Sequence, residues 1–143
     1  MVCLATMAVT GCSDDDDEGA PVVSLVPREA EGTCLNFTEE VGAEVTELPV
    51  VECAVPHSHE IIAVALSAEP VYPGFEALEA EAQRDCFRAF EPYVNTNPFD
   101  SELFVSWLLP TLTSWEKNDR QIVCVVGNTN DAPLVGTVKD SSR

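Results

Sequence analysis

The segment 75–91 predicts an amphipathic helix that packs one face against the rest of the domain. Its apolar residues recur at spacings of three and four, and charged residues occupy the opposite face. Pro73 and Gly74 precede it, and Pro92 is expected to end it, because a residue that precedes a proline avoids the α region. The apolar stripe consists of Phe75, Leu78, Ala82, Cys86, Ala89 and Phe90. Since Cys86 lies on this stripe, we expect a disulfide partner from the element beneath the helix.

Short runs of apolar and β-branched residues, separated by turn residues, predict the strands of a sheet. The run 61–66 is apolar on both faces, which is typical of a central strand. The pattern of 113–116 fits a capping box and predicts one helical turn. The other strand candidates are 33–37, 45–53, 103–109, 122–126 and 134–138. Together these segments predict an α+β fold, in which an antiparallel sheet of about five strands is covered on one face by the helix 75–91.

The balance of charge excludes several classes of partner. The 143 residues suit one domain and include 7 Lys and Arg against 25 Asp and Glu, a formal net charge of -18. A nucleic-acid-binding protein needs a basic surface to displace phosphate counterions, so we expect no nucleic-acid partner. For the same reason, charge alone would not hold this chain to anionic lipid headgroups.

The N-terminal segment 1–12 resembles a truncated lipoprotein signal. Its apolar residues lead to Val9-Thr10-Gly11-Cys12, which resembles the lipobox of bacterial lipoproteins. Cys12 is therefore the predicted lipidation site, and a lipid anchor would hold the protein at the membrane. A basic region and a longer apolar core are expected upstream of this segment. The alternatives are a cleaved signal without lipid and a clipped membrane helix.

The remainder of the chain divides into three segments. Segment 13–31 is acidic and then rich in Pro, Gly and Ala, which predicts a flexible linker with a reach of roughly 60 Å. The folded domain is expected to cover 32–138, and 139–143 is expected to be a polar tail.

Four cysteines of the expected domain predict two disulfides. The six cysteines of the chain stand at positions 3, 12, 34, 53, 86 and 124, and no two of them form a C-x-x-C pair. Of the three pairings, we favour Cys34 with Cys53, across a hairpin that turns near 42–43. The second bridge then joins Cys86 on the helix to Cys124 on a core strand. Two disulfides imply that the protein folds in an oxidising compartment. The alternative, a reactive or metal-bound thiol, suits Cys86 poorly, because a thiolate needs exposure and nearby positive charge.

His57, His59 and Glu60 are the candidate ligand-binding residues. On a strand, the two histidines would share one face and Glu60 would point to the other. In a turn, all three could converge on a metal ion as nitrogen and oxygen ligands. The alternative is structural: His57 packs near the Cys34–Cys53 bridge and bonds to the backbone, while His59 faces water.

No motif of the sequence predicts catalysis. The chain contains no Gly-rich phosphate loop and no G-x-S-x-G motif, so we assign neither an enzymatic activity nor a cofactor. A Cys–His nucleophile would need an unpaired cysteine beside His57. Trp107 and Trp115 could line a ligand groove, and the alternative for at least one of them is packing in the core.

A series of short motifs runs through 32–138 in a defined order. In chain order they are Gly32-Thr33-Cys34, Pro49-Val50-Val51-Glu52-Cys53, Pro56-His57 with Glu60, Tyr72-Pro73-Gly74, Cys86, Trp115, Asp119-Arg120 and Val123-Cys124. In order and spacing, this series resembles the septum formation family of actinobacterial envelope proteins. Asn118 stands where the family pattern has a glycine, and a turn accepts either residue.

The resemblance implies an extracytoplasmic domain that is attached to the membrane by a lipid or a membrane helix and is linked to septum formation or cell division. It implies that the domain's cysteines form bridges, and it gives His57 and Glu60 as motif positions without a known role. The expected function is a lipid-anchored binding or scaffold module on the outer side of the cell membrane, with an envelope or septal protein as its partner. The alternative is a small ligand- or metal-binding envelope protein that uses His57, His59 and Glu60.

Overall fold

An antiparallel sheet forms the centre of the domain. The computed structural model describes residues 30–37 and 48–143, and within them the sheet has five strands in the order β2-β1-β3-β5-β4. Every neighbouring pair is antiparallel. The strands are β1 (Cys34–Leu35), β2 (Val50–Val51), β3 (His59–Leu66), β4 (Leu103–Leu108) and β5 (Gln121–Asn128). The predicted α+β architecture is confirmed.

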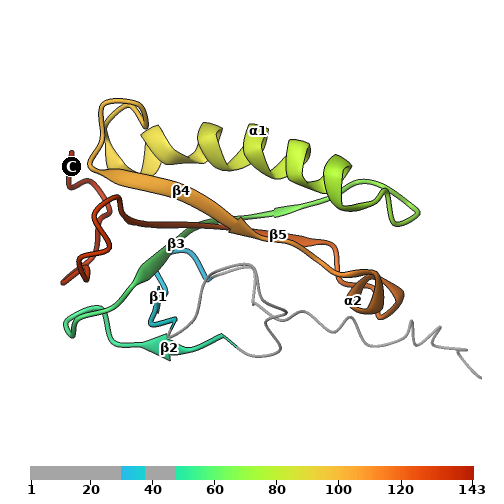
Figure 1. Ribbon diagram of the computed structural model, residues 1–143, viewed down its shortest axis with the longest axis horizontal. Helices are drawn as coiled ribbons and strands as arrows, with labels where there is room; N and C mark the ends of the chain where they lie inside the picture. Colours follow the sequence, from blue (N-terminus) through green and yellow to red (C-terminus); the bar gives the residue numbers. More distant parts are fainter. Residues whose placement is uncertain (1–29, 38–47) are drawn as a thin grey trace, which may run out of the picture.

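One long helix, α1 (Phe75–Val94), covers one face of the sheet (Figure 1). It packs against β3, β4 and β5, so the short strands β1 and β2 lie at the edge of the sheet away from β4. Its buried residues are Leu78, Ala82, Cys86, Phe90, Tyr93 and Val94. The predicted stripe is confirmed except at its start, because Phe75 is 62% exposed and lies before the helix reaches the sheet core.

The prediction that the helix ends at Pro92 is wrong. Pro92 is exposed and lies in the last turn, where its missing N–H costs one helical hydrogen bond. The next two residues, Tyr93 and Val94, are buried, and the carbonyl oxygens of both accept hydrogen bonds of 2.8 Å from the N–H groups of Asp140 and Ser142. Burial and these bonds to the last free carbonyls outweigh the lost bond.

The second face of the sheet is also apolar. Ala30, Leu35, Ile61, Val123 and Val125 form a buried cluster there, and Val64 packs against it. The strands β3 and β5 contribute side chains to both apolar faces, so their sequences are nearly continuous apolar runs. This was predicted for 61–66.

Smaller elements depart from the sequence prediction in detail. The helical turn α2 (Leu112–Glu116) is present, but Thr111 and Ser114 form its capping box, two residues before the predicted one. The candidate strand 134–138 is reduced to a single bridge between Leu134 and His57, and the Val138 N–H donates to Glu60 rather than to a neighbouring strand.

Several expectations concern residues outside the described ranges. The lipobox with Cys12, most of the linker 13–31 and the hairpin turn near 42–43 all lie there. Within 30–37 and 48–143, no helix has both the length and the apolar character that crossing a membrane requires.

Candidate functional site

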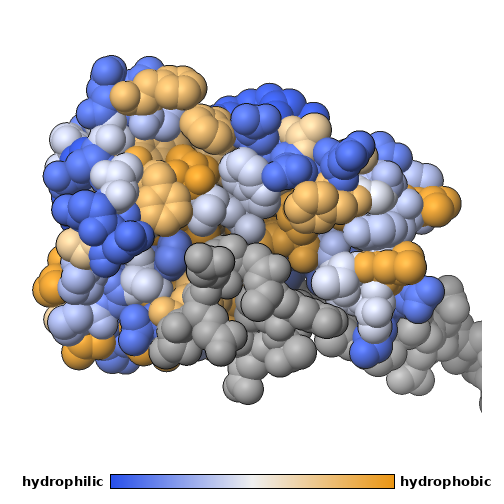
Figure 2. Space-filling model, viewed as in Figure 1, coloured by the Kyte–Doolittle hydropathy of each residue, from blue (hydrophilic) through white to orange (hydrophobic). Residues whose placement is uncertain are grey.

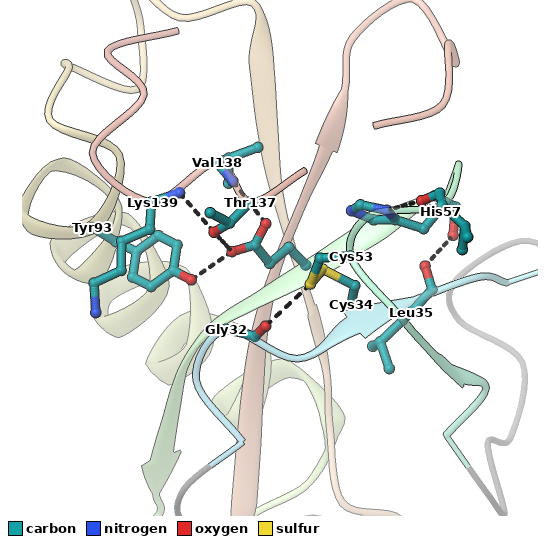
Figure 3. Close-up of a disulfide and its surroundings, with 12 residues drawn as sticks. Gly32, Cys34, Leu35, Cys53, His57, Tyr93, Thr137, Val138 and Lys139 are labelled. Carbon is teal, nitrogen blue, oxygen red and sulfur yellow. Dashed lines mark hydrogen bonds between the residues drawn. A yellow bond between two sulfur atoms is a disulfide. The ribbon is translucent and has the colours of Figure 1, made fainter. Parts of the chain in front are cut away.

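The carboxylate of Glu60 is the most deeply buried charged group among the described residues. Glu60 is 0% exposed, and its two oxygens accept three hydrogen bonds. The hydroxyls of Tyr93 and Thr137 each donate to Oε1 at 2.6 Å, and the Val138 N–H donates to Oε2 at 2.8 Å (Figure 3). A buried carboxylate is costly without such partners, so these donors replace the water that the group loses on folding.

The donors to Glu60 come from two other parts of the fold. Glu60 lies on β3, Tyr93 lies in the last turn of α1, and Thr137 and Val138 belong to the C-terminal segment. Burial raises the pKa of the Tyr93 hydroxyl, and the hydrogen bond to Glu60 raises it further. The Lys139 ammonium lies 5.3 Å from the centre of the Tyr93 ring and binds Glu31 at 3.0 Å, so it covers the outer side of the phenol.

The first disulfide lies beside this carboxylate. It joins Cys34 on β1 to Cys53 in the loop after β2, with Cα atoms 5.2 Å apart. Cys34 is buried, whereas Cys53 is partly exposed and its sulfur lies 3.5 Å from the Gly32 carbonyl oxygen. The predicted pairing is confirmed, and Figure 3 shows the bridge between Gly32 and the ring of His57.

His57 packs against the same bridge and is 0% exposed. Its backbone exchanges two hydrogen bonds with Leu134, and its ring Nδ1 lies 2.8 Å from the Val55 carbonyl oxygen. Because a carbonyl oxygen only accepts, Nδ1 carries the proton of this bond, and Nε2 is left buried without a partner among the described residues. A ring nitrogen of His57, the Cys34 sulfur and a Glu60 oxygen all lie within 4.8 Å of one another.

His59 lies outside this group. Its Nδ1 is 2.9 Å from the Ser58 hydroxyl, and its ring makes edge contacts with Phe37 and Phe104 at 5.4 and 5.7 Å. Burial lowers the pKa of His59, and the nearby His57 lowers it further. His57 thus makes the backbone bond and the disulfide contact that the structural alternative predicted, and His59 packs between Phe37 and Phe104 instead of facing water. Neither finding tests whether His57 binds a ligand.

The two-residue spacing of the histidines was misleading because His57 precedes β3. The strand begins at His59. Of the three candidate residues, only His59 and Glu60 therefore lie on the strand and point to opposite faces. The bend at Ser58 turns His57 to the side of Glu60.

The second disulfide ties the helix to the sheet. Cys86 on α1 and Cys124 on β5 are 0% and 1% exposed, and their Cα atoms lie 5.2 Å apart. This bridge was predicted from the apolar stripe and is confirmed. With all four domain cysteines paired, none is the free thiol that a Cys–His nucleophile beside His57 would need.

The remaining sequence motifs meet at the other end of the helix. The Arg120 guanidinium lies 3.8 Å above the Trp115 ring, and the Tyr72 ring meets Trp115 edge-on at 5.6 Å. Trp115 is buried and Trp107 packs half-buried against the same core, so both tryptophans contribute to packing. Tyr72, Trp115 and Arg120 therefore form one packed cluster.

Sequence reasoning did not find Tyr93 and Thr137 as partners of Glu60. The signal for Tyr93 was present, since it continues the apolar stripe three residues after Phe90. Tyr93 was not assigned to the helix because Pro92 was expected to end it. No local signal marks Thr137, which lies 77 residues from Glu60 in the chain.

Fold and site together define a small α+β domain that is cross-linked by two disulfides and built around a buried, hydrogen-bonded carboxylate. The chain belongs to the septum formation family, whose family model matches residues 26–140. Comparisons with curated proteins and with solved structures found no match.

Proposed function

We propose that this protein is an extracytoplasmic, lipid-anchored binding or scaffold module of the bacterial cell envelope that takes part in septum formation. Its family supports the link to septum formation. The observation that carries the location is the pair of disulfides, because cytosolic thiol systems keep cysteines reduced.

The construction of the domain suits a scaffold. The Cys86–Cys124 bridge joins α1 to β5, and Glu60 joins β3 to the end of α1 and to the C-terminal segment. A frame tied at these points loses little conformational freedom when a partner binds, so more of the contact energy becomes affinity.

On the face shown in Figure 2, apolar residues lie at the surface among hydrophilic ones. Phe99 is 83% exposed and its ring stacks on Phe87 at 5.7 Å, and Val71 is 73% exposed. Exposed aromatic side chains of this kind are enriched where proteins bind other proteins. The net charge of -18 makes a partner with a basic or apolar surface more suitable than an acidic one.

The anchor in this proposal is a lipid on Cys12. A single acyl chain gives only reversible membrane binding, so stable attachment requires more than one chain. Segment 13–31 would then allow the domain to reach up to roughly 60 Å from the bilayer, far enough to meet other envelope components.

Membrane fractionation of cells that produce the natural full-length protein tests the anchor. The wild type is expected in the membrane fraction, and Cys12→Ser is expected to lose this attachment. Cys3→Ser is the matched control, because it removes a cysteine from the same segment without touching the lipobox. Equal membrane attachment of all three proteins would contradict lipidation at Cys12.

Gene deletion tests the link to septum formation. Loss of the protein is expected to change the spacing or completion of septa, and the wild-type gene is expected to restore them. Crosslinking in living cells is expected to recover an envelope or septal protein. Normal septa together with no crosslinked partner would contradict the scaffold proposal.

A further inference from the structure

A buried group of three residues combines the side chains that zinc prefers. Cys34, His57 and Glu60 are each at most 1% exposed, and one ligand atom from each lies within 4.8 Å of the others. Thiolate sulfur, imidazole nitrogen and carboxylate oxygen are the common zinc ligands of proteins. The sulfur of Cys53 is bonded to that of Cys34, so a second sulfur lies next to this group, although it is not one of the three atoms that lie within 4.8 Å of one another.

His57 is already oriented as a metal ligand would be. Its Nδ1 donates to the Val55 carbonyl, which fixes the tautomer and leaves the lone pair on Nε2, and Nε2 is buried without a partner among the described residues. Metal-bound histidines usually show this pattern, in which a backbone carbonyl holds the other ring nitrogen.

Glu60 retains capacity to bind an ion. A carboxylate offers about four lone-pair positions, and three are used by Tyr93, Thr137 and the Val138 N–H. The position left is on Oε2, which accepts a single bond. The three existing bonds would then hold the carboxylate in place around a metal, as outer partners do in known zinc sites.

We propose that reduction of the Cys34–Cys53 disulfide converts this group into a tetrahedral zinc site. The ligands are the sulfurs of Cys34 and Cys53, Nε2 of His57 and a carboxylate oxygen of Glu60. A tetrahedral zinc ion holds its ligand atoms roughly 3.3–3.8 Å apart. The ring nitrogen, the Cys34 sulfur and the carboxylate oxygen lie within 4.8 Å of one another, so they need to approach by at most about 1–1.5 Å.

The disulfide and the ion exclude each other. A dithiol reductant supplies two electrons and two protons, breaks the S–S bond and becomes a disulfide itself, which leaves two thiols on the protein. Zinc then binds the two thiolates, and their two protons are released. Cys53 lies in a loop and is partly exposed, so it is the sulfur that can move away to the distance that a metal requires. In either state, β1 and the loop after β2 remain joined.

Zinc competition against a chromophoric chelator tests the site. The full chain is reduced by a phosphine in the absence of air. The phosphine is oxidised to the phosphine oxide, whose oxygen atom comes from water. One zinc ion per chain is expected in the wild type. The affinity is expected to fall at least about tenfold in His57→Ala, Glu60→Gln and the double variant Cys34→Ser with Cys53→Ser. His59→Ala is the matched control and is expected to bind as the wild type does. Equal affinity of the wild type and the double variant would overturn the proposal.

Thiol protection in the unmutated protein gives a readout that does not depend on the variants. In the reduced, folded chain, zinc is expected to slow alkylation of Cys34 and Cys53 and to leave the alkylation rates of the buried Cys86 and Cys124 unchanged. The latter pair is an internal control, because it belongs to no such ligand group among the described residues. If the reduced chain stays folded, equal slowing of all four domain cysteines by zinc would overturn the proposal. If reduction unfolds the chain, zinc is expected to restore its near-ultraviolet circular dichroism, and no recovery would overturn the proposal.

Discussion

The phenol of Tyr93 donates a hydrogen bond of 2.6 Å to Oε1 of Glu60, which lies 33 residues earlier in the chain. The two residues are 4% and 0% exposed, so water does not compete for this bond. It fixes the last turn of α1 against the start of β3 and is therefore a tertiary contact rather than a local one.

Replacing Tyr93 with phenylalanine should destabilise the domain by about 1.5–3 kcal/mol, the usual range for a hydrogen bond to a charged group. The substitution keeps the ring and removes one of the three donors to Glu60. Urea unfolding at neutral pH measures the change. Tyr72→Phe is the matched control, because the Tyr72 ring packs on Trp115 and its hydroxyl bonds to none of the described residues. Equal effects of the two variants would show that the bond to Glu60 carries no stability.

The stability of the wild type should fall at alkaline pH because of Tyr93. Burial and the bond to Glu60 raise the pKa of this hydroxyl, whereas tyrosine in an unfolded chain loses its proton near pH 10. The folded state thus binds the proton more tightly. The stabilisation is complete below about pH 10 and is lost above it, at up to about 1.4 kcal/mol per pH unit. Unfolding curves from about pH 9 to 11, with free thiols blocked, should converge for the wild type and Tyr93→Phe. Parallel curves would contradict this.

At acidic pH, His59 should destabilise the fold. Burial lowers its pKa below 6.5, and His57 adds to the shift, so the folded state resists protonation. The stabilisation is complete above about pH 6.5, the unfolded value, and is lost as the pH falls below it. Proton NMR of the ring should give a midpoint for His59 below 6.5. In His59→Leu, the loss of stability between about pH 7.5 and 5.5 should be smaller than in the wild type. A midpoint at or above 6.5 would contradict the burial of this ring.

The two disulfides should contribute unequally to stability. The Cys86–Cys124 bridge closes a separation of 38 residues and Cys34–Cys53 one of 19, which corresponds to about 4 and about 3 kcal/mol from restriction of the unfolded chain. Alanine pairs test this, because they avoid a buried hydroxyl. The pair at Cys86 and Cys124 should lower the urea midpoint more than the pair at Cys34 and Cys53. The reverse order would mean that local packing, rather than chain entropy, sets the difference.

Gly127 has no room for a side chain. A Cβ atom there would lie 2.9 Å from Cε1 of Phe104 and 3.2 Å from Cδ2 of His59. Gly127→Ala should therefore cost about 1–3 kcal/mol. Phe104→Leu removes the clashing ring atoms, so the double variant should lose less stability than the sum of the two single variants. Simple additivity in this cycle would contradict the contact between Phe104 and Gly127.

The sequence predicts those parts of the fold that produce a local periodicity of apolar residues. Spacings of three and four identified the buried face of α1, and with it the partnership of Cys86 and Cys124. The apolar runs identified β3, β4 and β5, which pair over most of their length. Strands β1 and β2 lie within the predicted segments 33–37 and 45–53 but are only two residues long. Among the described strands, β2 is at the edge and pairs with β1 alone.

The site was less predictable because its contacts are distant in sequence. His57 and Glu60 were selected as candidates, but the strand interpretation placed His57 on the same face as His59 and on the opposite face from Glu60. The turn alternative brought all three together, whereas in the structure, of the two histidine rings, only that of His57 lies beside Glu60. The continuation of α1 beyond Pro92 depends on bonds from Asp140 and Ser142, which a rule about neighbouring residues does not include. Thr137 and Val138 lie 77 and 78 residues from Glu60 in the chain, so no local pattern relates them to it.

The docking of the last residues against α1 affects how the protein can be tagged. The Arg143 guanidinium binds Glu102 and Asn128, and its carbonyl oxygen accepts a hydrogen bond from the Ser101 hydroxyl. A fluorescent reporter fused directly to Arg143 would compete with these contacts, only a few residues from the segment that holds Glu60. A reporter at this end therefore needs a long hydrophilic spacer, so that imaging follows the native domain.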